Sequence, residues 1–212
     1  MDTFIQQVIN GLVLGSLYSL IALGYTMVYG ILNLINFAHG DVLMVGALTA
    51  LSTILFLKSQ FPEMPGWLLL MFGTAVAIPV CILVSLLIER IAYRPLRNAP
   101  RLAPLITAIG VSIILQTAAM LIWGRNYMTF PQLLPSDPIV IGGATITVTK
   151  LLVIVLSGLI MVGLMLLVNR SKLGRAMRAT AENPRVAGLM GVNPNYVIAV
   201  TFAIGAALAA VA

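Results

Sequence analysis

The chain has 212 residues, of which 60% are hydrophobic and 8% are charged, and its mean hydropathy is +1.07. Soluble domains carry about 25% charged residues, so this composition excludes an ordinary soluble protein and predicts one that lies in a lipid bilayer. The formal net charge is +6, but nine of the twelve Lys and Arg residues fall within 90–101 and 170–185. Such clustering is typical of cytoplasmic loops of membrane proteins and argues against a nucleic-acid-binding surface.

Apolar runs long enough to cross a membrane recur along the whole chain. A hydrocarbon core of about 30 Å needs roughly 20 helical residues for each crossing. We therefore predict an all-α polytopic membrane protein with about six transmembrane helices, at 5–24, 41–57, 67–88, 103–123, 151–168 and 196–212. The last run reaches the final residue without a polar flank. We expect one transmembrane domain over 1–212 that continues beyond the sequence given.

The basic loops predict the orientation of these spans. Lys and Arg are retained on the cytoplasmic side, so 90–101 and 170–185 are expected inside and 58–66 and 124–150 outside, with the N-terminus outside as well. Trp67 and Trp123 then fall at the outer membrane interface, and Tyr93 and Tyr196 at the inner one. Aromatic residues favour both interfaces, which agrees with the assignment from charge.

The segment 25–40 carries polar residues where lipid is expected, and Asp41 is the one formal charge between Thr3 and Leu57. If the segment is helical, Asn33, Asn36 and His39 share one side of it, because their spacings are three residues. Polar side chains at membrane depth are tolerated where they face a bundle interior or a water-filled cavity.

Two interpretations of this segment stay open. In the first it is a broken helix that lines a translocation path, with breaks at Gly30 and Gly40. In the second it is a cytoplasmic turn, and His39 and Asp41 cap the following helix. Gln116, in the fourth apolar run, is a milder case, for which a hydrogen bond between helices is favoured over contact with a solute.

The external loop 124–150 contains two β-prone runs that flank Gly142-Gly143. A pair of glycines between such runs is a strong short-range signal of a β-hairpin. The hairpin would be a docking surface for an external protein or a lid that closes the loop.

The basic loop 169–195 is expected to end in a short surface helix over 182–191. Asn183 or Glu182 can cap its free N–H groups, Pro184 suits the first helical position, and Gly191 suits the stop. Val186, Leu189 and Met190 then form one apolar face.

Catalytic signals are absent from the sequence. It has no phosphate-binding Gly-rich loop, and the single His39 and the single Cys81 leave no metal cluster or nucleophile–base pair. We expect neither an enzyme nor a resident cofactor.

Three stretches of the sequence carry a resemblance to a known family: ALGYTMVYGILNLINFAHGDVLMVGA, IERIAYRPLRNAPRLAPLITAIGVSIILQ and LGRAMRATAENPRVAGLMGVN. Together they resemble the LivH-type permease subunits of bacterial branched-chain amino acid ABC importers, and the likeness extends over essentially all 212 residues. The outer loop is the least similar part.

The resemblance implies an inner-membrane subunit that translocates leucine, isoleucine and valine. It implies a second homologous permease, two cytoplasmic ATPases and a periplasmic amino-acid-binding protein as partners, and 169–195 as the cytoplasmic coupling loop. Related permeases carry urea and short amides, so the resemblance alone leaves the solute open. A different class, an ion-coupled secondary transporter or channel for a small polar solute, would keep acid or His relays in its spans, where only Asp41 and His39 qualify.

Overall fold

The computed structural model describes residues 2–32, 35–97, 99–100, 102–134, 138–141 and 144–212. The helices are α1 (Asp2–Leu32), α2 (His39–Gln60), α3 (Gly66–Ile88), α4 (Leu102–Trp123), α5 (Val148–Arg170), α6 (Lys172–Glu182), α7 (Pro184–Leu189) and α8 (Pro194–Val211). A π-helical turn η1 (Glu89–Tyr93) and a 3₁₀ turn η2 (Arg94–Leu96) continue α3, and two strands, β1 (Pro138–Ile141) and β2 (Ala144–Thr147), precede α5.

Within the described residues, six helices are long and apolar enough to span a membrane, namely α1 to α5 and α8. The chain is therefore the predicted all-α polytopic membrane protein. The six apolar runs of the sequence each lie in one of these helices. Apolar runs of this length form helices in lipid because a helix satisfies all its backbone hydrogen bonds internally.

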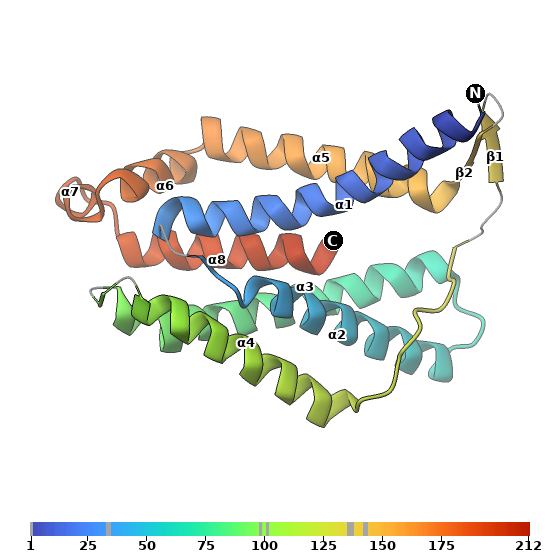
Figure 1. The fold of residues 1–212 in the computed structure, drawn as a ribbon, viewed down its shortest axis with the longest axis horizontal. Helices are drawn as coiled ribbons and strands as arrows, with labels where there is room; N and C mark the ends of the chain where they lie inside the picture. Colours follow the sequence, from blue (N-terminus) through green and yellow to red (C-terminus); the bar gives the residue numbers. More distant parts are fainter. Residues whose placement is uncertain (1, 33–34, 98, 101, 135–137, 142–143) are drawn as a thin grey trace.

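Helix α8 lies at the centre of the bundle and is the most buried of the six spans. It packs against α1, α2 and α3, while α5 covers α1 and α4 contacts α2. Figure 1 shows α5, α1 and α8 stacked on one side and α2, α3 and α4 on the other. The main core joins these halves through buried side chains from α1, α2, α3, η1 and α8, among them Val28, Val42, Cys81, Tyr93 and Phe202.

The first helix is longer than predicted. It continues through Gly30 to Leu32, and Gly40 is the second residue of α2. Both glycines predicted as break points therefore lie inside helices, and the break falls between Leu32 and His39. A glycine in a helix costs about 1 kcal/mol relative to Ala. The helix continues past Gly30 because Ile31 and Leu32 pack against the main core.

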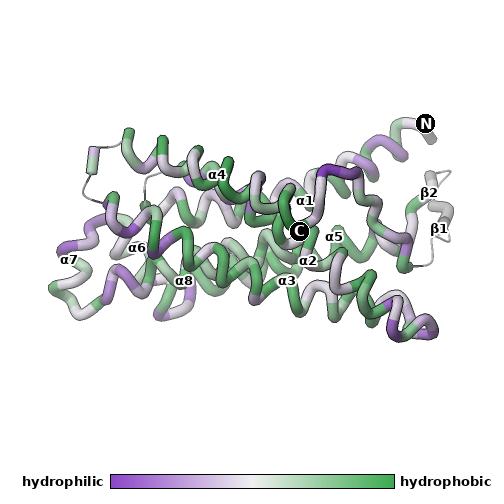
Figure 2. Tube along the Cα trace, turned by 90° about the horizontal axis from the view of Figure 1, so that it is seen from below, coloured by the Kyte–Doolittle hydropathy of each residue, from purple (hydrophilic) through white to green (hydrophobic). Residues whose placement is uncertain are grey.

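Hydrophilic residues gather toward the two ends of the bundle, and hydrophobic residues cover its length (Figure 2). The basic segments 90–97 and 170–185 lie at one end, where Arg97 bonds to Asn195 (Figure 1). The segments 61–66 and 124–134 lie at the opposite end, where Gly66 lies against Leu133. This is the arrangement that alternate crossing of a membrane by six helices requires.

The loop 124–150 forms the predicted β-hairpin in its described residues. β1 and β2 are antiparallel, with Ile141 opposite Ala144, and the Gly142-Gly143 turn lies outside the described residues. The side chain of Gln6 in α1 accepts from the Thr145 backbone N–H at 2.8 Å and donates to the Thr145 carbonyl at 3.0 Å. The hairpin is thus fastened to the start of the first helix.

Candidate functional site

The connection from α1 to α2 returns into the bundle before α2 begins. A Cβ atom placed on Gly24 would lie 2.9 Å from His39 Nε2, so the first residue of α2 is level with Gly24. Gly24 precedes the end of α1 at Leu32 by eight residues, which is about 12 Å of helix at a rise of 1.5 Å per residue. The polar residues from Asn36 to Asp41 therefore lie within the bundle, well inside its end.

Asn36 is buried, and its side-chain carbonyl accepts a hydrogen bond of 2.8 Å from the hydroxyl of Tyr93 in η1. The Tyr93 ring in turn packs on Phe202 of α8, with 5.7 Å between ring centroids. Asn36 is thus linked to η1 and, through the Tyr93 ring, to α8. Asn33, the other predicted asparagine, lies outside the described residues.

His39 is buried between α1 and α8. Its imidazole meets the Tyr25 ring edge-on, with 6.2 Å between centroids. Among the described residues, Nε2 has no hydrogen-bond partner. Buried polar atoms are nearly always paired with protein groups or water, so an unpaired nitrogen at this depth is unusual.

Asp41 lies in the first turn of α2, where the helix dipole favours a negative charge. The expectation that His39 and Asp41 cap this helix is wrong in detail: the N-cap residue is Ala38, and no side-chain cap bond occurs among the described residues. Instead, Asp41 accepts a 3.0 Å bond from the Gln116 side chain of α4. The Asp41 carboxylate therefore bonds to a neighbouring span, α4, and not to the N–H groups at the start of its own helix.

Gln116 places that carboxylate deep in the bundle. It follows the start of α4 at Leu102 by fourteen residues and precedes its end at Trp123 by seven, which is about 21 Å and 10 Å along the helix. The predicted hydrogen bond between helices is confirmed for Gln116, which also donates to Ser112 at 3.2 Å.

The short helix predicted in the basic loop is α7, and both its ends are fixed by local hydrogen bonds. Asn183 caps it by accepting from the N–H groups of Arg185 and Val186, and Pro184 is its first residue. At the other end Gly191 has φ +84°, and the N–H groups of Gly191 and Val192 bond back to Gly188 and Ala187. This Schellman arrangement is a common stop signal.

The apolar side chains predicted on this helix are exposed. The exposed fractions are 52% for Val186, 87% for Leu189 and 80% for Met190, whereas Ala187 on the inner side is buried. Three neighbouring apolar side chains are therefore exposed together on this short helix and its C-cap. We call this set, Val186, Leu189 and Met190, the α7 apolar face.

Glu182 does not begin this helix as predicted. It is the last residue of a separate helix, α6, which sequence reasoning did not predict. The N-terminal half of the loop is helical because Ser171 caps it, accepting from Gly174 N–H at 2.9 Å, and because Gly174, Met177 and Thr180 face inward at helical spacing. Asn183 ends α6 and caps α7, so Glu182 stands at the corner between the two.

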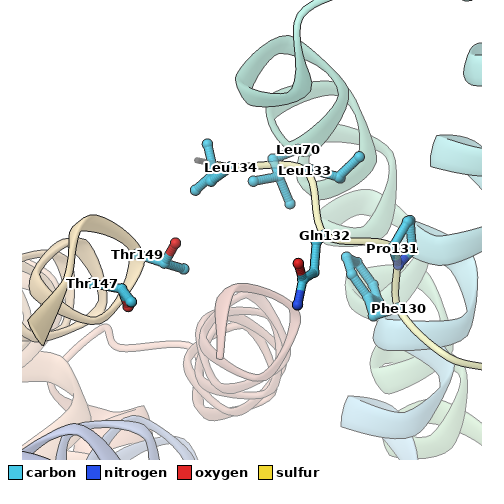
Figure 3. Close-up of a pocket in the computed structure, with 8 residues that line it drawn as sticks. All are labelled: Leu70, Phe130, Pro131, Gln132, Leu133, Leu134, Thr147 and Thr149. Carbon is cyan, nitrogen blue, oxygen red and sulfur yellow. The ribbon is translucent and has the colours of Figure 1, made fainter. Parts of the chain in front are cut away.

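A cavity of about 440 Å³ lies at the end of the molecule opposite α7 (Figure 1). Figure 3 shows the 130–134 segment on one side of it and Thr147 and Thr149 on the other. Its lining is mostly apolar and contains none of Asn36, His39 and Asp41. It belongs to the outer loop rather than to the polar turn at the centre of the bundle.

The profile of the family described as branched-chain amino acid transport system / permease component matches residues 7–212 of this chain. The chain belongs to this family.

Individual relatives agree with the family match. The permease of Pseudomonas aeruginosa called "high-affinity branched-chain amino acid transport system permease protein BraD" is 47% identical over 99% of this chain and 69% of its own length. LivH of Escherichia coli K12, with the same description, is 44% identical over the same shares. A probable LivH of Methanocaldococcus jannaschii is 29% identical over 96% of this chain and 63% of its own length. No solved structure gives a significant match.

The chain is thus a multi-pass inner-membrane permease subunit, and it spans about 69% of the length of the relatives from Pseudomonas and Escherichia. The sequence alone did not reveal Tyr93 as the hydrogen-bond partner of Asn36 in this permease. Tyr93 was expected at the inner membrane interface, but it is 2% exposed, because its hydroxyl finds Asn36 inside the bundle.

Two further residues of the permease were missed. Glu89 is buried and forms an ion pair with Arg97, although the sequence analysis treated Arg97 as one of several loop cations. The available signal was Glu89 itself, which stands as an acid at the end of an apolar run and so requires a nearby partner when it is buried.

Proposed function

We propose that this permease is the transmembrane subunit of an ABC importer that carries leucine, isoleucine and valine across the bacterial inner membrane. Its relatives are described as permeases of high-affinity branched-chain amino acid transport, which supports the substrate class. Hydrolysis of ATP takes place in separate partner subunits, and the permease itself performs no catalysis. The observation that carries the proposal is the exposed α7 apolar face at the end of the bundle that also holds the basic segments.

The coupling surface consists of α7 and its two ends: Glu182, Asn183, Pro184, Val186, Leu189, Met190 and Gly191. A short helix that is capped at both ends moves as a rigid unit. A segment that transmits motion between domains has to be rigid in this way. Fully burying a side chain such as Leu189 contributes about 1.5–3 kcal/mol. Contact with a cytoplasmic ATPase therefore accounts for apolar side chains that would otherwise face water.

The substrate path includes Asn36, His39 and Asp41, at the point where α2 begins inside the bundle. Asn33, which lies outside the described residues, is assigned to the same path from its place in the sequence. An amino acid carries an ammonium and a carboxylate. Asp41 provides the negative charge for the ammonium, and the N-terminal N–H groups of α2 favour the carboxylate. His39 adds an imidazole nitrogen that has no other partner among the described residues. Beginning a helix at this depth is a recurrent way of exposing such groups to a solute.

The remaining partners follow from an importer of this class. A second homologous permease completes the membrane path, each permease contacts one ATPase, and a periplasmic protein delivers the amino acid to the outer end. The external loop 124–150 is the surface that meets this binding protein, since it lies at the end opposite α7.

The proposal is tested with the full transporter in proteoliposomes, measuring ATPase co-purification, leucine uptake and hydrolysis stimulated by the binding protein. Leu189→Asp puts a charge into the α7 apolar face. We expect loss of ATPase association with the membrane fold preserved, as judged by size-exclusion chromatography. Tyr127→Asp, at a fully exposed aromatic residue of the loop 124–150, is the control for ATPase association alone and should keep the ATPase. Full ATPase association and full uptake by Leu189→Asp would contradict the proposal. Uptake that needs an ion gradient instead of ATP would favour an ion-coupled secondary transporter in its place.

A further inference from the structure

Helix α3 passes into an irregular turn at its inner end. Residues 89–93 form the π-helical turn η1, and 94–96 form a 3₁₀ turn. Single π turns are rare in proteins, and those that do occur are often found at functional sites. This one holds two buried polar side chains, because Glu89 is 4% exposed and Tyr93 is 2% exposed.

The Glu89 carboxylate is paired with Arg97, which follows the 3₁₀ turn. Nη2 of Arg97 contacts Glu89 Oε1, and Nη1 of the same guanidinium donates to Asn195 Oδ1 in the first turn of α8. One planar guanidinium therefore joins the end of α3 to the start of α8. Arginine suits this position because its donors form a rigid fork that meets two acceptors at once.

The other end of η1 reaches the polar turn before α2. The Tyr93 hydroxyl donates to Asn36 Oδ1 at 2.8 Å, and both residues are buried. Glu89 and Tyr93 belong to the same five-residue turn. A displacement of η1 at Glu89 therefore also moves the hydroxyl that holds Asn36.

The chain from α7 to Arg97 is short and braced. Leu189 ends α7, the Schellman bonds at Gly191 close it, and Asn193 caps α8 by accepting from the N–H groups of Asn195 and Tyr196. Five residues, 190–194, separate the end of α7 from Asn195, the residue that Arg97 holds, and the caps on both sides leave them little freedom. Motion of α7 is thus delivered to Asn195 directly.

We propose that Arg97 is a positioning residue that couples α7 to the substrate path, through Asn195 on one side and through Glu89, η1 and Tyr93 to Asn36 on the other. The inference rests on the proposed contact of α7 with an ATPase. It assigns no contact with the amino acid to Arg97. Its consequence is that breaking either end of this connection separates hydrolysis from transport.

The test uses two mild variants of the full transporter in proteoliposomes. Asn195→Ala removes the bond to α8 but leaves the buried ion pair, and Tyr93→Phe removes one hydroxyl. For each, the leucine taken up per ATP hydrolysed is measured with ATPase co-purification. We expect association and stimulated hydrolysis to persist while uptake per ATP falls about twofold or more, the effect typical of residues along a coupling connection. Tyr196→Phe, which removes an exposed hydroxyl beside Asn195, should leave the ratio unchanged.

The double variant decides whether the two contacts belong to one connection. If they do, Asn195→Ala with Tyr93→Phe lowers uptake per ATP no further than the stronger single change, because either break already interrupts the connection. An unchanged ratio in the single variants, or effects that simply multiply in the double variant, would overturn the inference. The ratio does not depend on the amount of folded protein. Failure of the unmodified transporter to bind an ATPase would overturn the proposed function instead.

Discussion

Asp41 is a buried charge for which a structural role and the proposed role in transport can be separated by experiment. Its carboxylate is buried and accepts a 3.0 Å bond from Gln116. A charge at the centre of a membrane helix costs about 2.5–3.5 kcal/mol on insertion scales. A neutral amide would form the same hydrogen bond without that cost. The helix dipole at the first turn of α2 favours the charge by about 0.3–1 kcal/mol, which offsets only part of the cost, and the remainder agrees with the proposed role of the charge in the substrate path.

Asp41→Asn separates the two roles. The amide keeps the shape of the side chain and still accepts from Gln116, so thermal stability of the transporter in detergent should be equal or higher. Leucine uptake should fall about tenfold or more, because a hydrogen bond to a charged group is worth about 1.5–3 kcal/mol. Glu63→Gln, at an exposed acid of the outer end, is the control and should change neither measurement. Normal uptake by Asp41→Asn would show that the carboxylate is structural.

The polar residues of this site that lie in apolar runs could be predicted from the sequence. Their hydrogen-bond partners could not, because these lie far away along the chain. Asn36, His39 and Asp41 stand out because polar groups are rare in apolar runs. Their partners do not stand out: Tyr93 is 57 residues from Asn36, and Gln116 is 75 residues from Asp41. Pairing over such separations depends on which helices pack together, which periodicity does not reveal.

At the scale of elements, the closest approach in the site is between α1 and α8. A Cβ placed on Gly24 would lie 2.9 Å from His39 Nε2 and 3.1 Å from the Gly205 carbonyl, and one on Gly205 would lie 3.1 Å from the Gly24 carbonyl. The two glycines therefore allow α1 and α8 to meet with His39 between them. Small residues at Thr201, Gly205 and Ala209 give α8 the surface for this contact, since all three are buried.

Gly24→Ala should force α1 away from His39 and α8. We expect a loss of about 1–3 kcal/mol, the usual cost of overpacking a well-filled core, and a lower midpoint of thermal unfolding in detergent. Gly30→Ala, in the same helix but with no atom within 4 Å of the added Cβ, is the matched control and should be neutral or slightly stabilising. Equal midpoints for the two variants would show that α1 and α8 do not approach this closely in the membrane.

Helices with long apolar runs were predictable, and those whose ends depend on packing were not. The six spans, the hairpin and the Asn183, Pro184 and Gly191 signals of α7 all follow from local chemistry. The end of α1 was misplaced because Ile31 and Leu32 pack against the core, so the helix continues past Gly30. Helix α6 was missed because its charged residues resembled a solvated loop, although Met177 and Thr180 are buried on its inner side.

At the scale of the whole molecule, charge and geometry describe the same arrangement. The two basic segments lie at one end of the bundle, and the hairpin and the 124–134 segment lie at the other (Figure 1). The positive-inside rule then assigns the α7 end to the cytoplasm, where ATP is available, and the hairpin end to the outside. The proposed contacts with the ATPase and with the binding protein both depend on this orientation.

Labelling from each side of the membrane tests that orientation. Tyr127→Cys places a thiol at a fully exposed position of the outer end, and Ala179→Cys places one on an exposed position of α6. A thiol reagent that does not cross the membrane should modify Tyr127→Cys in intact cells with the outer membrane permeabilised, and Ala179→Cys only in inverted vesicles. The unmodified chain is the control, because its single Cys81 is fully buried and should not react from either side. Modification of both variants from the same side would contradict the orientation, and with it the assignment of α7 to the ATPase, because the ATPase would then have no access to the α7 apolar face.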